Sequence, residues 1–167
     1  EKSDFGHERK ETRMENRICE EMREFNKIYK EFDDLWHETA LHIGLSDSAF
    51  DILYSVYCLG DGCLQRDICA LSFGRKQTIN SAIQKLVKEG LLLMKQGKGR
   101  EMHIYLTEAG NTFVRQKVEP LVEIEDSVWR EMPPEERQEL IRLTKQYVVH
   151  YRAKIRKLTA NQVMGGD

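Results

Sequence analysis

Residues 65–106 read QRDICALSFGRKQTINSAIQKLVKEGLLLMKQGKGREMHIYL. The first seven of them predict a short helix with Ile68 and Leu71 facing inward, and residues 72–74 predict a tight turn that contains a glycine. A longer helix is expected over residues 75–89, because apolar residues recur along it every three or four positions. Its expected buried positions are Ile79, Ile83, Leu86 and Val87. Two short helices joined by such a turn are typical of a helix-turn-helix.

Two strand-like segments follow at residues 91–95 and 102–106, and Gly90 ends the helix before them. The residues between the segments, 96–100, include two glycines and two cations, which predicts a β-hairpin with a basic, flexible tip. A helix-turn-helix followed by a cationic hairpin indicates a winged helix. The predicted fold class is therefore mainly α with a small β-hairpin wing, an α+β winged helix. Long N- and C-terminal helices are expected to form a dimerisation region.

A long amphipathic helix is predicted upstream, because the segment from Met14 to Ile43 carries apolar residues at steps of three and four. Such a helix is about 45 Å long. That length exceeds what a small core covers, so we expect much of its apolar face to pack against another subunit. The alternative is a helix that packs only on the core of its own chain. Gly44 ends the pattern, and Ser46 is the expected N-cap of a second helix that reaches Leu59.

Downstream of the hairpin, Thr107 is expected to cap a helix that Pro120 kinks or breaks. Two prolines at positions 133 and 134 end this region, and a last helix carries one apolar face as far as Leu158. The chain is thus predicted to have a polar, disordered tail at residues 1–12, an N-terminal dimerisation helix at 13–44, a winged helix-turn-helix domain at 45–107, C-terminal dimerisation helices at 108–160 and a tail at 161–167.

The net charge of −2 hides a strong asymmetry along the chain. Residues 1–63 hold 8 Lys/Arg against 15 Asp/Glu, residues 64–107 hold 8 against 3, and residues 108–167 hold 10 against 10. The three segments therefore carry net charges of −7, +5 and 0. A basic segment that coincides with a helix-turn-helix favours double-stranded DNA as the partner.

Other functional classes receive no support from motifs. The four cysteines form no CxxC, and His37 and His42 lie five residues apart, so we expect no disulfide framework, no metal and no cofactor. We expect no enzyme either, because the chain lacks a Gly-rich phosphate loop and a nucleophile elbow. No apolar run approaches the roughly 18 residues of a membrane span. The charged N-terminus also lacks the apolar core of a signal peptide, so we expect a cytoplasmic protein without membrane association.

At this point the sequence resembles the MarR family of bacterial transcription regulators. The resemblance covers roughly residues 14–158 and rests on residues 65–68, 77–86, 88–91 and 105–110, the last of which are similar to the family's Leu-Thr-Glu-x-Gly signature. It implies a homodimer with intertwined terminal helices, whose two winged-helix lobes bind a palindromic operator. The family's wing commonly carries Asp-x-Arg, whereas this chain has Lys98-Gly99-Arg100 and so lacks the carboxylate that braces the arginine.

The expected DNA contacts come from the second helix and the hairpin. Amides on the outer face of that helix suit base edges, and Gln77 and Asn80 are the types that pair with adenine. Its cations suit phosphates, and Arg100 is expected to reach a minor groove. The full expected set is Arg75, Lys76, Gln77, Thr78, Asn80, Ser81, Gln84, Lys85, Lys98 and Arg100. The alternative is that these are ordinary solvated polar residues.

The resemblance also implies that a small aromatic or amphipathic ligand releases the repressor from DNA. The candidate residues for such an effector site are Trp36, His37, Tyr54 and Tyr57. The alternative for these aromatic residues is that they belong to the core, as such residues at helical spacing usually do.

Two other functions stay open. Some relatives sense oxidants through a cysteine near the start of the first helix, and Cys19 lies in that region, although Glu20 and Glu21 disfavour its thiolate. A cysteine-based redox-sensing regulator is therefore one alternative. The other is a dimeric winged-helix interaction module that does not bind DNA, which the missing wing carboxylate favours.

Overall fold

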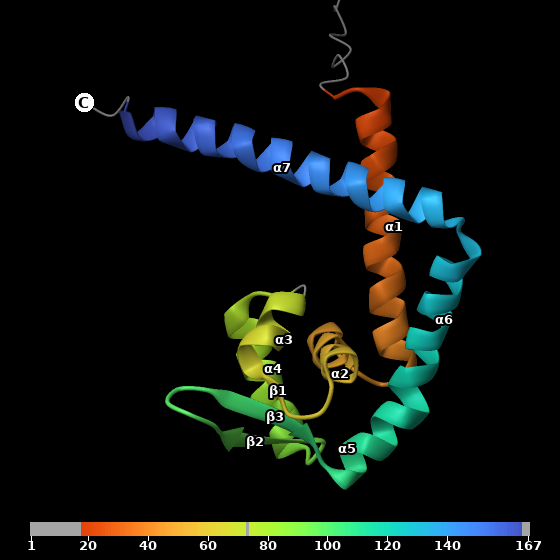
Figure 1. The fold of residues 1–167 in the computed structure, drawn as a ribbon, viewed down its shortest axis with the longest axis vertical. Helices are drawn as coiled ribbons and strands as arrows, with labels where there is room; N and C mark the ends of the chain where they lie inside the picture. Colours follow the sequence, from red (N-terminus) through yellow and green to blue (C-terminus); the bar gives the residue numbers. More distant parts are fainter. Residues whose placement is uncertain (1–17, 73, 165–167) are drawn as a thin grey trace, which may run out of the picture. The chain divides into compact units, whose positions relative to one another are not determined.

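The structure of the protein is a computed structural model that describes residues 18–72 and 74–164 (Figure 1). Its elements are, in chain order, α1 (Glu20–His42), α2 (Asp47–Leu59), β1 (Cys63–Leu64), α3 (Gln65–Leu71), α4 (Lys76–Lys88), β2 (Leu92–Gln96), β3 (Met102–Leu106), α5 (Glu108–Phe113), the π-helical turn η1 (Val114–Val118), α6 (Glu119–Glu131) and α7 (Pro134–Met164). They fall into two compact units, Glu1–Phe50 and Asp51–Asp167, with the division inside α2.

In the first unit, helix α1 begins later than the sequence pattern predicted. Cys19 has an extended backbone and Glu20 is the first helical residue, so Ile18 precedes the helix; Met14 lies outside the described residues. Glu20 and Glu21 occupy the first turn, where their carboxylates interact favourably with the positive end of the helix dipole. The 23 residues of α1 span about 35 Å rather than the expected 45 Å.

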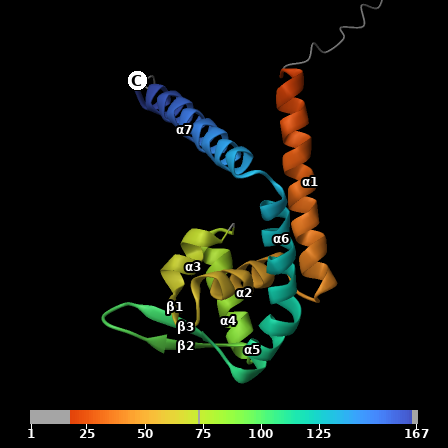
Figure 2. The same cartoon turned by 45° about the vertical axis from the view of Figure 1, so that its right-hand side comes forward.

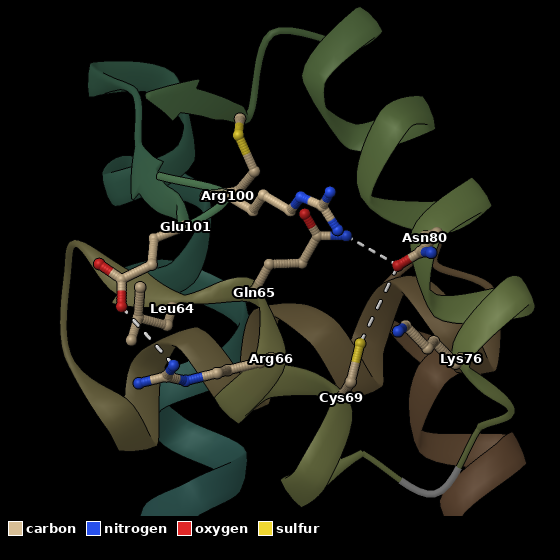
Figure 3. A pocket seen from close by; sticks show the side chains of 9 residues that line it. Leu64, Gln65, Arg66, Cys69, Lys76, Asn80, Arg100 and Glu101 are labelled. Atoms are coloured by element: carbon tan, nitrogen blue, oxygen red, sulfur yellow. Dashed lines mark hydrogen bonds and ion pairs between the residues drawn. The ribbon is translucent and has the colours of Figure 1, made fainter. Parts of the chain in front are cut away.

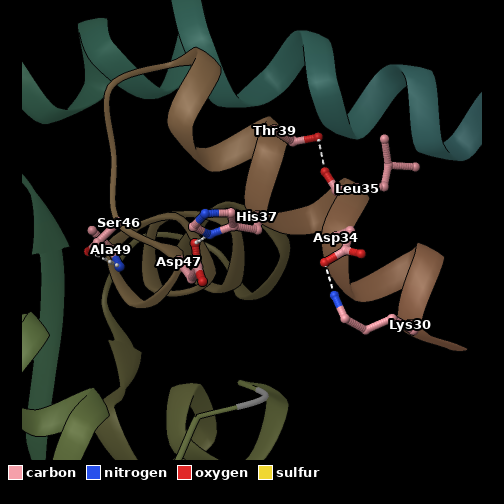
Figure 4. A network of polar contacts seen from close by, with 8 residues as sticks. All are labelled: Lys30, Asp34, Leu35, His37, Thr39, Ser46, Asp47 and Ala49. Atoms are coloured by element: carbon pink, nitrogen blue, oxygen red, sulfur yellow. Dashed lines mark hydrogen bonds and ion pairs between the residues drawn. The ribbon is translucent and has the colours of Figure 1, made fainter.

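Side-chain contacts join the end of α1 to the start of α2 within this unit (Figure 4). The Trp36 and Phe50 rings lie 4.6 Å apart between centroids, and His37 Nδ1 lies 2.7 Å from Asp47 Oδ1. Ser46 caps α2 as predicted, because its Oγ accepts a hydrogen bond from the Ala49 amide at 3.4 Å. The turn between the helices is therefore held by a ring contact, a polar pair and a cap.

The second unit buries one apolar core between its helices and its sheet. The fully buried side chains, each at most 1% exposed, include Ile52, Leu53, Val56, Ile68, Ile79, Ile83, Leu86, Leu92 and Ile104. Helix α4 packs on β2, and α3 packs on β1 and β3. The helix-turn-helix is confirmed, with α3 at the predicted residues and α4 one residue shorter at each end; Phe73 of the turn lies outside the described residues.

The wing is a three-stranded antiparallel sheet in the order β1-β3-β2. In the predicted hairpin, Leu92 pairs with Leu106 and Gln96 with Met102. Strand β1 was not predicted, because two residues show no periodicity, and it forms only because Cys63 pairs with Ile104. The loop between β2 and β3 extends beyond α3 and α4 in two views of the molecule (Figures 1 and 2). The fold class, a mainly helical winged helix with a small antiparallel sheet, is confirmed.

Two residues predicted to be buried are not. Leu71 is 44% exposed, because α3 turns its contact face toward Gln65 and Cys69, which lie on the opposite side of Ile68 from Leu71. Val87 is half-buried, because it lies at the edge of the α4 stripe rather than at its centre.

The C-terminal helices begin at the predicted capping and proline residues. Thr107 caps α5 by accepting a hydrogen bond from the Gly110 amide at 2.9 Å. Where a kink or a break was predicted, the helix is not interrupted but passes through η1, in which the Glu119 amide bonds back to the Val114 carbonyl, and Pro120 then occupies the first turn of α6. Helix α7 runs to Met164, four residues into the region predicted as a tail. Within the described residues, no helix has the length and apolar character that crossing a bilayer requires.

Gly110 explains the glycine of the Leu-Thr-Glu-x-Gly sequence. A Cβ at this buried position would overlap the backbone carbonyl oxygen of Leu91 and lie 2.9 Å from its carbon. That carbonyl is itself fixed, because the Thr107 amide donates to it at 3.1 Å. The first turn of α5 therefore sits directly on the start of the wing.

We expect Gly110→Ala to lower the free energy of unfolding by about 2 kcal/mol, the usual cost of overpacking a rigid site. In an ordinary helix the same change stabilises by up to about 1 kcal/mol. Urea unfolding of both proteins measures the difference, with Thr112→Ala on the exposed side of α5 as the control. A variant as stable as the parent would show that α5 does not touch Leu91.

Candidate nucleic-acid interface

The orientation of α4 follows from its buried face. Ile79, Ile83 and Leu86 are 0% exposed, so the helix cannot rotate without opening the core. The opposite face presents the exposed side chains of Gln77, Thr78, Ser81, Gln84 and Lys85. All five belong to the set predicted to contact DNA. Arg75 is exposed and forms the N-cap of the helix.

Several side chains on this face have local partners. Ser81 Oγ donates a hydrogen bond to the Gln77 carbonyl at 3.0 Å, within the helix. Gln84 Nε2 lies 3.3 Å from the Met94 sulfur on β2, and Lys85 forms an ion pair of 3.8 Å with Glu89. An exposed ion pair of this kind contributes less than about 1 kcal/mol. Lys85 can therefore leave Glu89 for a phosphate at small cost.

Asn80 is not on the outer face where the sequence pattern placed it. It is half-buried on the flank of α4 that faces α3, because it follows the buried Ile79 by one residue, or about 100°. Its Oδ1 accepts a hydrogen bond from Gln65 Nε2 at 2.7 Å, and the Cys69 sulfur lies 4.0 Å from the same oxygen. Asn80 thus joins α4 to α3, and a bidentate pairing with adenine would require this bond to break.

The tip of the wing carries Lys98 and Arg100, both exposed. Gly99 has φ +63°, a left-handed conformation that the turn requires, and its carbonyl accepts a hydrogen bond from Gln96 Nε2 at 3.1 Å. The next residue, Glu101, pairs with Arg66 of α3 at 3.6 Å. The wing therefore has a carboxylate next to its arginine, but that carboxylate contacts α3.

A cavity of about 340 Å³ lies between α3, α4 and the wing (Figure 3). Three cations from three elements line it, namely Arg66, Lys76 and Arg100, together with Gln65 and Asn80. The structure thus brings together Lys76, Asn80 and Arg100 of the predicted set. Arg66 and Gln65 were not predicted as site residues, although both belong to the block that carries the family resemblance. The sequence feature that could have identified these two residues is the polar first turn of the helix before α4.

Tyr54 and Tyr57 lie together in a second cavity, between α2 and α6, within the second unit. Burial and a 2.6 Å hydrogen bond to Glu125 raise the pKa of Tyr54 well above its ordinary value. Tyr57 donates to Glu119 at 3.2 Å, and partial burial raises its pKa too. Both hydroxyls are therefore protonated donors at neutral pH.

The remaining candidate residues belong to the first unit. Trp36 packs on Phe50 and His37 pairs with Asp47, as described above, so both residues hold the α1–α2 junction. Cys19 is exposed and precedes α1. Its proposed redox role stays a prediction. Within residues 18–72 and 74–164, no group of three His, Cys, Asp or Glu side chains converges as a set of metal ligands.

Comparison with solved structures identifies the fold. A MarR family regulator from Neisseria meningitidis is 19% identical, with a TM-score of 0.67 over 86% of this chain and 99% of that one. The MepR–DNA complex from Staphylococcus aureus is 17% identical, with a TM-score of 0.59 over 80% and 98% of the two chains. BpsR from Bordetella bronchiseptica, whose DNA binding is regulated by 6-hydroxynicotinic acid, is 19% identical, with a TM-score of 0.58 over 78% and 99%.

No protein-family model matches the sequence, and no curated protein matches it. The likeness to these solved structures is therefore a likeness of fold. The chain has the winged helix fold of the MarR family regulators.

The contact between α3 and α4 is open to a direct test. We expect Gln65→Ala and Asn80→Ala each to destabilise the fold, and their effects to be coupled by about 1 kcal/mol, because the two changes remove one hydrogen bond. Urea unfolding of the parent, the two single variants and the double variant gives this coupling energy. Gln65→Ala paired with Gln77→Ala, on the outer face, is the matched control and should be additive. Additivity in both cycles would show that Gln65 and Asn80 do not interact.

Proposed function

We propose that this chain, which has the fold of the MarR family regulators, is a sequence-specific DNA-binding transcription regulator. The observation that carries the proposal is the convergence of Arg66, Lys76 and Arg100 on one cavity beside the exposed polar face of α4. In a helix-turn-helix the start of the second helix contacts base edges in the major groove. Cations around it neutralise phosphates and position the protein. The occurrence of this fold in the MepR–DNA complex supports the same use here.

The residues divide between positioning and base recognition. Gln77 and Thr78, in the exposed first turn of α4, are suited to base edges. Asn80 has its Oδ1 held by Gln65, which leaves its amide N–H groups as donors toward a base acceptor. Lys98 and Arg100 at the wing tip contact the backbone or the minor groove beside the recognition site. Arg66 is added to the phosphate-contacting set, because its exposed pair with Glu101 costs little to exchange.

We further propose that the regulator is a homodimer that binds a palindromic operator. In α1, Tyr29, Phe32 and Leu35 are 69%, 56% and 61% exposed. Helix α7 leaves Tyr151 and Leu158, which lie on one face of it, similarly open, at 59% and 55%. Rows of exposed apolar side chains of this length mark interaction surfaces. A second copy of the chain supplies matching rows, as a two-fold interface requires.

Release from DNA by a small ligand completes the proposal, with the chain acting as a repressor. Tyr54 and Tyr57 line a cavity that such a ligand would occupy. The regulation of BpsR by a small molecule supports this part of the proposal. The neighbour from Neisseria meningitidis is a regulator rather than an enzyme, in line with a non-enzymatic function.

A second candidate, a winged-helix interaction module without DNA binding, is favoured by one observation. Glu101 pairs with Arg66 and the family's bracing aspartate is absent from the wing, so Arg100 lacks that support. Selection of bound duplexes from a random DNA pool separates the two functions. We expect an enriched inverted repeat with half-sites about one helical turn apart, bound more weakly as salt rises. Failure to enrich any sequence would favour the interaction module.

Variants assign the roles of the DNA-contacting residues. We expect Arg100→Ala to weaken binding to all duplexes about tenfold and to reduce the dependence on salt by about one phosphate contact. Gln77→Ala should relax the preference at one position of each half-site by about 1–3 kcal/mol. Fluorescence anisotropy at two salt concentrations measures both effects. Arg115→Ala, an exposed arginine on η1, is the control and should bind like the parent. Equal binding by all three variants would contradict the assignment of α4 and the wing.

The dimer is tested by placing a charge in the α1 row. We expect Phe32→Glu to convert the dimer into monomers at micromolar concentration, because a charge cannot be buried in an apolar interface without a partner. Light scattering after size exclusion measures the mass. Lys27→Glu, which reverses a charge on an exposed side chain 73% accessible to solvent, is the control and should stay dimeric. A Phe32→Glu protein of unchanged mass would place the dimer interface elsewhere.

A further inference from the structure

The cavity between α2 and α6 has a distinctive composition. It encloses about 330 Å³, a volume within the range of small-molecule sites. Three aromatic side chains line it, Tyr54 and Tyr57 from α2 and Trp129 from α6. All three are accessible from the cavity: the tyrosines are half-buried and Trp129 is 37% exposed. A core cluster would bury such rings, whereas these form the walls of an open cavity.

The hydroxyl groups of the two tyrosines hold α2 and α6 together. Tyr54 donates to Glu125 at 2.6 Å and Tyr57 donates to Glu119 at 3.2 Å. Each bond joins residues more than 60 positions apart in the chain. The ring positions are therefore set before any ligand arrives, which lowers the entropy cost of binding. Neither donor neutralises its carboxylate, because a phenol that keeps its proton is uncharged.

The surroundings of the cavity are strongly acidic. Besides the rings, the lining includes the carboxylates of Glu123, Glu125 and Asp126. Asp126 is paired with Arg130 at 2.5 Å. Helix α6 holds five acidic residues and one basic residue, a net charge of −4, and α2 holds two aspartates and no lysine or arginine. Arg130 is the one basic residue in the two helices that form the cavity. The negative charge at the cavity is therefore only partly balanced.

We propose that this cavity binds an organic cation with an apolar body, such as a quaternary ammonium or phosphonium ion. Aromatic faces attract cations through their quadrupole, and Glu123 and Glu125 add a charge attraction. The same carboxylates repel a carboxylate or phenolate ligand of similar shape. This inference rests on the proposed function, because it gives the chemical class of the ligand that acts on the proposed regulator. It adds the sign of the ligand's charge to the proposed function.

Two probes of the same shape and opposite charge test the proposal. Tetraphenylphosphonium and tetraphenylborate are titrated separately into the full chain by calorimetry, in a sodium buffer that keeps the borate soluble. We expect the phosphonium to bind at least tenfold more tightly than the borate. Equal affinities would show an apolar cavity without charge selection and would overturn the proposal. Tighter binding of the borate, or no binding of either ion, would also overturn it.

Charge-removing variants locate the binding. Glu123→Gln with Glu125→Gln should weaken phosphonium binding at least tenfold, and the glutamine carbonyl at position 125 still accepts the Tyr54 hydrogen bond. Trp129→Leu should weaken it similarly by removing an aromatic wall. Glu131→Gln removes one charge from α6 outside the cavity lining and is the matched control, expected to bind like the parent. If Glu131→Gln loses as much affinity as the double variant, the cation is attracted by the total charge of α6 rather than bound in the cavity, and the assigned site is wrong. Thermal melting confirms that each variant is folded.

The duplex selected from the random pool separates this inference from the proposed function. If the chain binds the phosphonium but enriches no DNA sequence, the cation site is supported and the proposed regulator function is contradicted. An enriched operator with no phosphonium binding would remove the cation site alone. With both present, we expect saturating phosphonium to lower the affinity for the operator at least fivefold, and an unchanged affinity would disconnect the cavity from DNA release.

Discussion

The complete burial of the inner face of α4 sets the geometry on which the proposed interface depends. Ile79, Ile83 and Leu86 are fully enclosed, so α4 has one possible rotation about its axis. That rotation exposes Gln77 and Thr78 and turns Asn80 toward α3. Without it, the polar residues of the helix would have no defined direction. Sequence recognition by side chains requires such a fixed direction, because each base edge offers donors and acceptors at set positions.

The wing and the two helices of the motif are joined by polar contacts as well as by the core. Gln65 bonds to Asn80 of α4, and the neighbouring Arg66 pairs with Glu101 of the wing. Helix α3 therefore contacts both of the other elements. A change in α3 would affect α4 and the wing together. The carboxylate beside Arg100, that of Glu101, therefore positions the wing against α3.

The net charge of −2 is the sum over acidic, basic and neutral segments of the chain. The winged-helix segment is basic, whereas α2 and α6 are acidic around an aromatic cavity. The basic segment and the cavity both lie in the unit Asp51–Asp167. One compact unit therefore has a surface suited to a polyanion and a cavity suited to a cation. Total charge alone would have indicated neither the basic segment nor the acidic cavity.

Local sequence was sufficient for the helix-turn-helix, the presence of the hairpin and the caps at Ser46 and Thr107, because each depends on residues a few positions apart. Periodicity also identified the buried face of α4. It did not find β1, whose partner Ile104 lies 41 positions on, or the contacts of Asn80 with Gln65 and of Tyr54 with Glu125. A helical pattern shows which side of one helix is apolar, but it does not show which distant polar side chain contacts that helix. Those contacts depend on how the elements pack against one another, and packing is a property of the whole unit rather than of any segment of its sequence.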